Sequence, residues 1–178
     1  MSGYDVVLLI EQPFTTKDAT NLRGLHEDIE DPVLYHVLLP VEDASARVES
    51  AMGSLATGEV LATPAVTVND SDFDGLREEL LDTCREGVEA TVKVIEQAGG
   101  RAVGVPVTND PIRALIDKVA EVGAAEVIIL TRPHLVRDFL HLDWTSRARR
   151  KLGVPVLHLL EHENFDEQAG EGEGISGF

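Results

Sequence analysis

Short apolar runs and stretches of helical periodicity alternate along the chain. The apolar runs are rich in valine, isoleucine and leucine, and a run of this kind is typical of a strand that helices cover on both faces. Five such runs predict strands, over residues 4–10, 33–41, 101–107, 126–130 and 154–160. Pro40, near the end of the second run, predicts that pairing stops there.

Helical periodicity is clearest over residues 74–98. Positions spaced by three and four residues predict one buried face, made of Leu76, Leu80, Cys84, Val88, Thr91, Ile95 and Ala98. Gly99 and Gly100 are expected to end this helix. A second helix is predicted after Asp110-Pro111, an N-cap followed by proline at the first helical position, and is expected to end at Gly123.

Three other segments have weaker patterns. A short helix is expected within residues 15–29, and a last helix over about 143–152. Residues 43–73 are rich in Ala, Ser, Thr, Gly and Asp and form a long excursion whose structure the pattern does not define.

The alternation of strands and helices predicts an α/β fold, a three-layer α/β/α sandwich with a five-stranded parallel sheet. One domain is expected over residues 1–160, followed by an acidic, disordered tail over 161–178. Ligands of such sheets bind beyond the carboxyl ends of the strands, where the strand order reverses. This rule places a site near Glu11, Glu42, residues 108–110 and residues 131–143.

The second half of the chain resembles the universal stress protein family. The residues that carry the resemblance are Val-Thr-Asn-Asp-Pro at 107–111, the apolar segment at 122–130 and Pro155-Val156-Leu157. The resemblance extends over about residues 4–160. It implies an adenine nucleotide α-hydrolase-like fold and a dimer formed through the last strand.

The ATP-binding glycines of that family are missing. The family's ATP-binding branch carries Gly, two residues, Gly, nine residues, then Gly with Ser or Thr, and such glycines let backbone N–H groups reach phosphate. Counting back from Pro155 puts these positions at Ile129, Arg132, Leu142 and Asp143. No glycine occurs anywhere over residues 124–152, so neither ATP nor another cofactor is expected.

The residues left to line a ligand cleft come from the ends of the first, second and fourth strands: Glu11, Val41, Arg132, Arg137 and Asp143. Glu11 matches the family's adenine-contacting aspartate. Arg132 and Arg137 favour a phosphate or carboxylate ligand, because a guanidinium presents a planar fork to such groups. The alternative is that the basic residues between 132 and 151 serve structure, since three of them end a helix.

The net charge of the chain limits which kinds of partner it can bind. Fifteen basic and 32 acidic side chains give −17, with only four lysines, which disfavours nucleic acid and anionic membranes. No apolar run approaches the roughly 20 residues of a membrane helix, and we expect a cytoplasmic protein. The acidic excess suggests a halophilic source; an ordinary acidic protein is the alternative.

Other chemistry is weakly supported. His134, Asp138 and His141 share a face if their segment is helical, but an amphipathic surface explains them as well as a metal, and no metal site is expected. Cys84, the one cysteine, is expected to be an inert core thiol rather than a reactive one. No nucleophile–base set or dinucleotide-binding glycine motif is present.

These observations favour a non-catalytic, homodimeric binding or regulatory module. The alternative is a stress protein that binds a nucleotide or other anion through arginines, and an enzyme of the wider fold is a third hypothesis. Two copies are expected to pair through strand 154–160, an apolar edge. If residues 43–73 cover that edge instead, the protein is a monomer.

Overall fold

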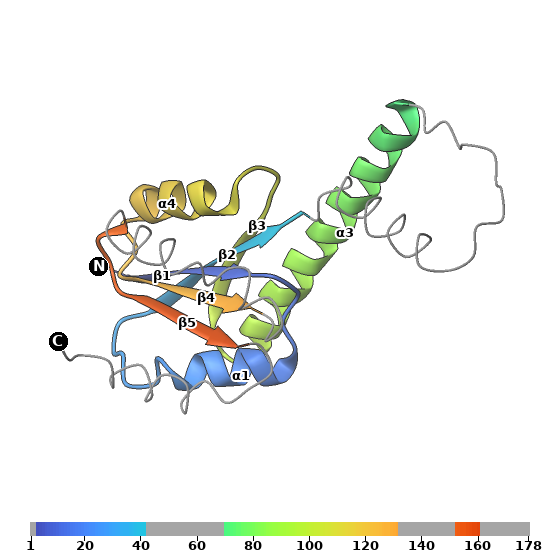
Figure 1. Ribbon diagram of the computed structural model, residues 1–178. Coiled ribbons are helices and arrows are strands. Elements are labelled where there is room, and N and C mark those ends of the chain that lie inside the picture. The colour runs from blue at the N-terminus through green and yellow to red at the C-terminus, as the bar shows by residue number, and fades with distance from the viewer. Residues whose placement is uncertain (1–2, 42–69, 132–151, 161–178) are drawn as a thin grey trace, which may run out of the picture.

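The computed structural model describes residues 3–41, 70–131 and 152–160. Strands and helices alternate along these residues (Figure 1). Their bounds are β1 Tyr4–Ile10, α1 Thr16–Gly24, β2 Val33–Pro40, α3 Asp70–Gln97, β3 Arg101–Val107, α4 Pro111–Val122, β4 Glu126–Thr131 and β5 Val156–Leu160.

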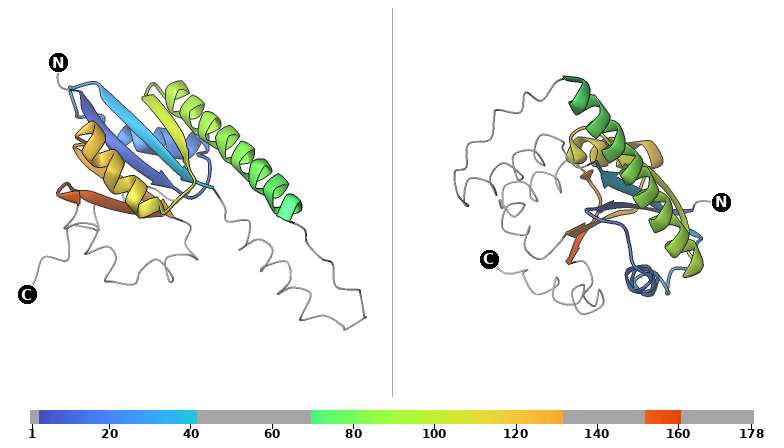
Figure 2. Two further views of the ribbon diagram at one scale, coloured as in Figure 1. Left: turned by 90° about the horizontal axis from the view of Figure 1, so that it is seen from above. Right: turned by 90° about the vertical axis from the view of Figure 1, so that its right-hand side faces the viewer.

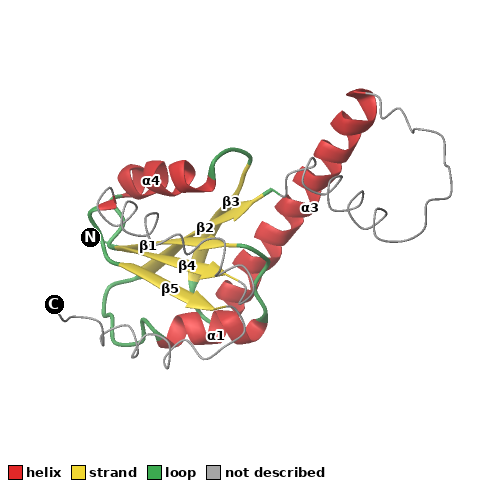
Figure 3. Ribbon diagram, in the orientation of Figure 1, coloured by secondary structure: helices red, strands yellow, loops and turns green. Residues whose placement is uncertain are grey.

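The five strands form one parallel sheet in the order β3-β2-β1-β4-β5. α1 and α3 cover one face and α4 covers the other, as the views of Figure 2 and the colouring of Figure 3 show. The sheet is therefore the middle layer of three, and the predicted α/β fold is confirmed. β3 and β5 are its two edge strands.

Two hydrophobic cores lie on the two faces of the sheet, because alternate strand residues point to opposite sides. Val6, Leu8 and Ile10 of β1 pack towards α1 and α3, whereas Val7 and Leu9 pack towards α4. This is why the strands appear in the sequence as continuous apolar runs.

Helix α3 buries the face predicted from its periodicity. Leu80, Cys84, Val88, Thr91 and Ile95 are all buried. The helix begins at Asp70 rather than 74, so the excursion is four residues shorter than predicted. Aspartate and serine at residues 70–72 resemble a loop in composition, but acidic residues also stabilise the first turn of a helix.

The other element ends also follow local chemistry. Asp110 caps α4, with Ile112 N–H donating to Asp110 Oδ1 at 2.9 Å, and Gly123 ends the helix in the left-handed conformation at φ 63°. Both features were predicted. β5 begins at Val156 instead of 154, because Pro155 has no N–H to donate and contributes only its carbonyl, which accepts from Val127 N–H at 2.9 Å.

Several predictions lie outside the described residues. These are the excursion over 43–69, most of the last helix over 143–152 and the tail over 161–178. Within residues 3–41, 70–131 and 152–160, no helix is both long and apolar enough to cross a membrane.

Candidate functional site

The strand order reverses between β1 and β4. β2 and β3 lie to one side of β1, and β4 and β5 lie to the other. Because all strands are parallel, their carboxyl ends share one edge of the sheet, and the connection after β1 leads from that edge to α1. This edge is the place where a doubly wound sheet holds a ligand.

Two of the predicted cleft residues lie at this edge. Glu11 follows β1 directly and is half-buried, and Val41 follows β2 directly. Val41 N–H donates to the carbonyl of Val107, the last residue of β3, at 2.8 Å. This bond fixes the backbone directly after β2 against the last residue of β3. Arg132, Arg137 and Asp143 lie outside the described residues, as do the metal candidates His134, Asp138 and His141.

Helix α1 follows the loop after β1 and begins with a capping box. Asp18 N–H donates to Thr15 Oγ1 at 3.3 Å, and Thr15 N–H donates to Asp18 Oδ2 at 2.8 Å. Asp18 is 1% exposed, so its carboxylate is buried against the positive end of α1. The helix start that faces the switch point is thus already occupied by an acidic side chain.

The described part of the edge is acidic. Within residues 11–18, 41 and 107–111 the acidic side chains are Glu11, Asp18 and Asp110, and the basic one is Lys17. Negative side chains repel a polyanion over a distance of about 10 Å at 0.1 M salt. This balance disfavours a triphosphate near the ends of β1 and β3.

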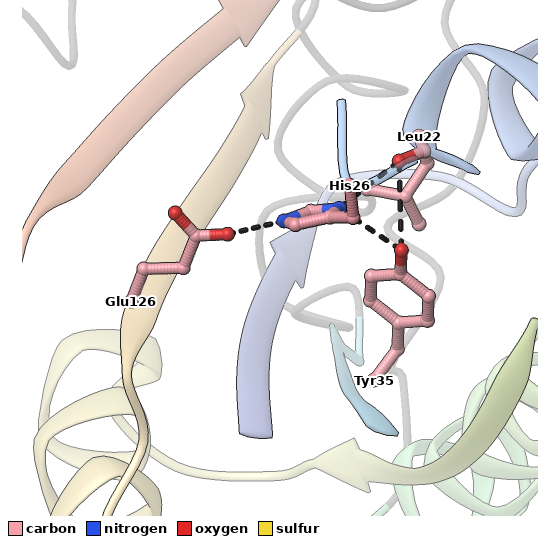
Figure 4. Close-up of polar contacts among 4 residues, drawn as sticks. All are labelled: Leu22, His26, Tyr35 and Glu126. Carbon is pink, nitrogen blue, oxygen red and sulfur yellow. Dashed lines mark hydrogen bonds and ion pairs between the residues drawn. The ribbon is translucent and has the colours of Figure 1, made fainter. Parts of the chain in front are cut away.

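A second polar cluster lies at the opposite, amino-terminal edge of the sheet (Figure 4). His26 follows α1, Tyr35 lies in β2, and Glu126 is the first residue of β4. His26 Nε2 pairs with Glu126 Oε1, and Nδ1 lies 3.1 Å from the Leu22 carbonyl oxygen and 2.9 Å from Tyr35 Oη. The cluster therefore ties α1 to both β2 and β4.

Burial makes this cluster structural rather than ligand-accessible. His26 is 4% exposed and Tyr35 is 0% exposed. Burial raises the pKa of Tyr35 to about 12, with Arg23 opposing the rise and the Glu126 charge adding to it. Burial, with the Glu126 charge as a smaller cause, also raises the pKa of Tyr4.

The sequence pattern does not reveal this cluster. Its members are far apart in the chain: His26 and Glu126 are 100 positions apart. The one signal in the sequence is the presence of polar residues, Tyr35 and Glu126, in largely apolar strand runs. Cys84, in contrast, is as predicted: it is buried, burial raises the pKa of its thiol, and Sγ–H donates to the Leu39 carbonyl at 3.2 Å.

No family model and no curated protein matches the chain. Solved structures share its fold. A hypothetical protein whose structure served as a test case of structural genomics is 13% identical, with a TM-score of 0.55 over 91% of this chain and 99% of that chain. A universal stress protein family protein from Arabidopsis thaliana, solved with AMP bound, is 14% identical, with a TM-score of 0.51 over 92% and 94%. The chain therefore has the fold of universal stress proteins.

Proposed function

We propose that the chain is a non-catalytic member of the universal stress protein family, a homodimeric binding or regulatory module that does not use ATP. One observation carries the proposal: a fold shared with universal stress proteins is combined with a glycine-free segment over residues 124–152. In the family's ATP-binding branch this segment holds the glycines that admit phosphate to the backbone.

The charges at the carboxyl edge support the same conclusion. Glu11 and the buried Asp18 lie at the end of β1 and the start of α1, and Asp110 caps the helix after β3. In the described part of this edge a triphosphate faces the negative charges of Glu11, Asp18 and Asp110 and the positive charge of Lys17 alone. We therefore expect the dissociation constant of ATP to be above about 1 mM, so that the binding free energy is smaller in magnitude than roughly 4 kcal/mol.

A second candidate is a nucleotide- or anion-binding protein that uses Arg132 and Arg137. The AMP bound in the Arabidopsis structure favours a nucleoside monophosphate as the ligand class. A monophosphate carries less negative charge than ATP, and two arginines are sufficient to contact one phosphate group. In this version we expect Glu11, at the end of β1, to contact the base.

A thermal-shift series at molar KCl separates these candidates. ATP at 1 mM is expected to stabilise the protein by less than about 0.4 kcal/mol, because the ligand is then at or below its dissociation constant. AMP at 100 times its dissociation constant stabilises by about 2.7 kcal/mol if the second candidate holds. Inorganic phosphate tests whether the anion alone is recognised. Release of AMP or phosphate from ATP on incubation would overturn the non-catalytic assignment.

The dimer part of the proposal uses the edge strand β5. Among the described strands β5 pairs only with β4, and we propose that its other side pairs with a second copy. Two copies related by a two-fold axis satisfy both edges at once. Leu159 is 0% exposed, whereas Leu157 is half-buried and packs at the margin of the same core, so Leu157 is the less disruptive position for a test of pairing.

A further inference from the structure

We propose that Thr91 and Gly87 of α3 are positioning residues for the ligand site. They hold the β1–α1 loop, residues 11–15, against one turn of α3 and thereby fix where Glu11 lies. The inference rests on the proposed function in one respect, that the carboxyl edge of the sheet is where a ligand binds.

The first contact is a buried hydrogen-bond relay. Phe14 N–H donates to Thr91 Oγ1 at 3.1 Å, and Thr91 Oγ1–H donates to the Gly87 carbonyl at 2.9 Å. Thr91 is 0% exposed. A hydroxyl has one donor and two acceptor positions, so both bonds form at the same time. The relay connects parts of the chain that are 77 residues apart.

The second contact is close packing at Gly87. A Cβ atom there would lie 2.8 Å from Pro13 Cγ and 3.0 Å from Leu39 Cδ2. Only a residue without a side chain lets the helix approach the loop and the end of β2 so closely. Pro13 and Phe14, consecutive in the loop, therefore contact α3 at positions 87 and 91, one turn apart.

A comparison within α3 separates this role from ordinary helix chemistry. Thr83 makes the same bond to the carbonyl four residues before it, Glu79, at 2.9 Å, but Thr83 is exposed and lies on the outer side of the helix. Thr91 makes that bond and also accepts the Phe14 N–H. The Thr91 hydroxyl thus binds the loop as well as its own helix, whereas the bond that the Thr83 hydroxyl donates stays within the helix.

The β1–α1 loop connects these contacts with α3 to Glu11 at the ligand site. Upstream of Pro13 the loop leads to Glu11, and downstream of Phe14 it enters the capping box that starts α1. α3 packs on the same face of the sheet as α1 and extends past the carboxyl ends of the strands (Figures 1 and 2). The position of Glu11 is therefore set by α3 as well as by β1.

Amide hydrogen exchange of Phe14 measures the relay directly. In the wild-type protein this amide is expected to be protected, and Thr91→Val, which keeps the shape and removes the hydroxyl, is expected to speed its exchange about tenfold or more. Thr91→Ser restores the acceptor and is expected to restore protection. Thr83→Val, the matched control, leaves the Phe14 amide unchanged. Rapid exchange of Phe14 in the wild-type protein overturns the proposal even if Thr91→Val does not fold.

AMP titration of the same variants tests the link to binding. Where the wild-type protein binds AMP, Thr91→Val is expected to weaken the affinity about tenfold, with Thr91→Ser and Thr83→Val near wild type. Faster Phe14 exchange with unchanged AMP affinity overturns the positioning role. Failure of the wild-type protein to bind AMP counts against the nucleotide-binding function alone, because the exchange of Phe14 still decides whether α3 holds the loop.

Discussion

The hydroxyl of Tyr35 is expected to make the protein less stable at alkaline pH. This side chain is 0% exposed and its oxygen lies 2.9 Å from His26 Nδ1. Burial raises its pKa to about 12, against 10.0 for a free tyrosine. Between pH 10 and about 12 the Tyr35 hydroxyl is therefore ionised more readily in the unfolded state than in the folded state.

The size of the effect follows from the two pKa values. Below pH 10 the hydroxyl is protonated in both states, so its contribution to stability is complete. Between pH 10 and about 12 the unfolded state loses its proton first, and stability falls. The loss is about 1.4 kcal/mol at pH 11 and reaches an upper limit of about 2.7 kcal/mol above pH 12.

Urea unfolding of the wild-type protein and Tyr35→Phe at about pH 9 and pH 11 measures this loss. The variant loses the contacts of the hydroxyl with His26 Nδ1 and the Leu22 carbonyl, about 1 kcal/mol for each bond at both pH values, and it has no hydroxyl to ionise. Wild type is therefore expected to lose about 1.4 kcal/mol more than the variant on going to pH 11. The chain has two tyrosines, so tyrosinate absorbance in Tyr4→Phe follows Tyr35 alone. Equal losses in wild type and Tyr35→Phe would refute the reasoning.

Three further predictions concern salt, acid and assembly. The free energy of unfolding is expected to rise between low and molar KCl, because screening relieves the self-repulsion of a −17 chain; a flat or falling melting temperature contradicts this. Burial lowers the pKa of His158, so the unfolded state takes up a proton first as pH falls below the usual histidine pKa, and the protein loses stability there. Urea unfolding is expected to show a smaller loss of unfolding free energy with falling pH in His158→Gln than in wild type. Equal losses in the two proteins would count against this role of His158. Light scattering is expected to show a dimer that Leu157→Lys dissociates and that Val105→Lys, on the exposed face of the other edge strand, leaves intact; a monomeric wild type excludes the interface.

Local chemistry explains which parts of the fold were predictable. The two ends of α4 were predictable because each depends on single residues. Asp110 caps the start of the helix, Pro111 fixes φ at its first position, and Gly123 ends it in the left-handed conformation. The buried face of α3 follows from spacing alone. The element ends at Asp70 and Val156 were misplaced because the same residue types suit both a loop and the first residues of an element.

Contacts between distant segments were not predictable in the same way. Thr91 was placed on the buried face of α3, but nothing in its neighbourhood showed that its hydroxyl accepts from Phe14 N–H. The pairing of His26 with Glu126 likewise depends on β1 lying between β2 and β4. Glu11 and Val41 were placed correctly at strand ends, since the switch-point rule needs only the order of elements; their role in binding stays a prediction.

Calorimetric titration of ATP into the protein at molar KCl tests the central claim most directly. The account predicts a dissociation constant weaker than about 1 mM, because the glycine cradle is missing from residues 124–152 and carboxylates line the described part of the carboxyl edge. A micromolar dissociation constant for ATP would contradict it.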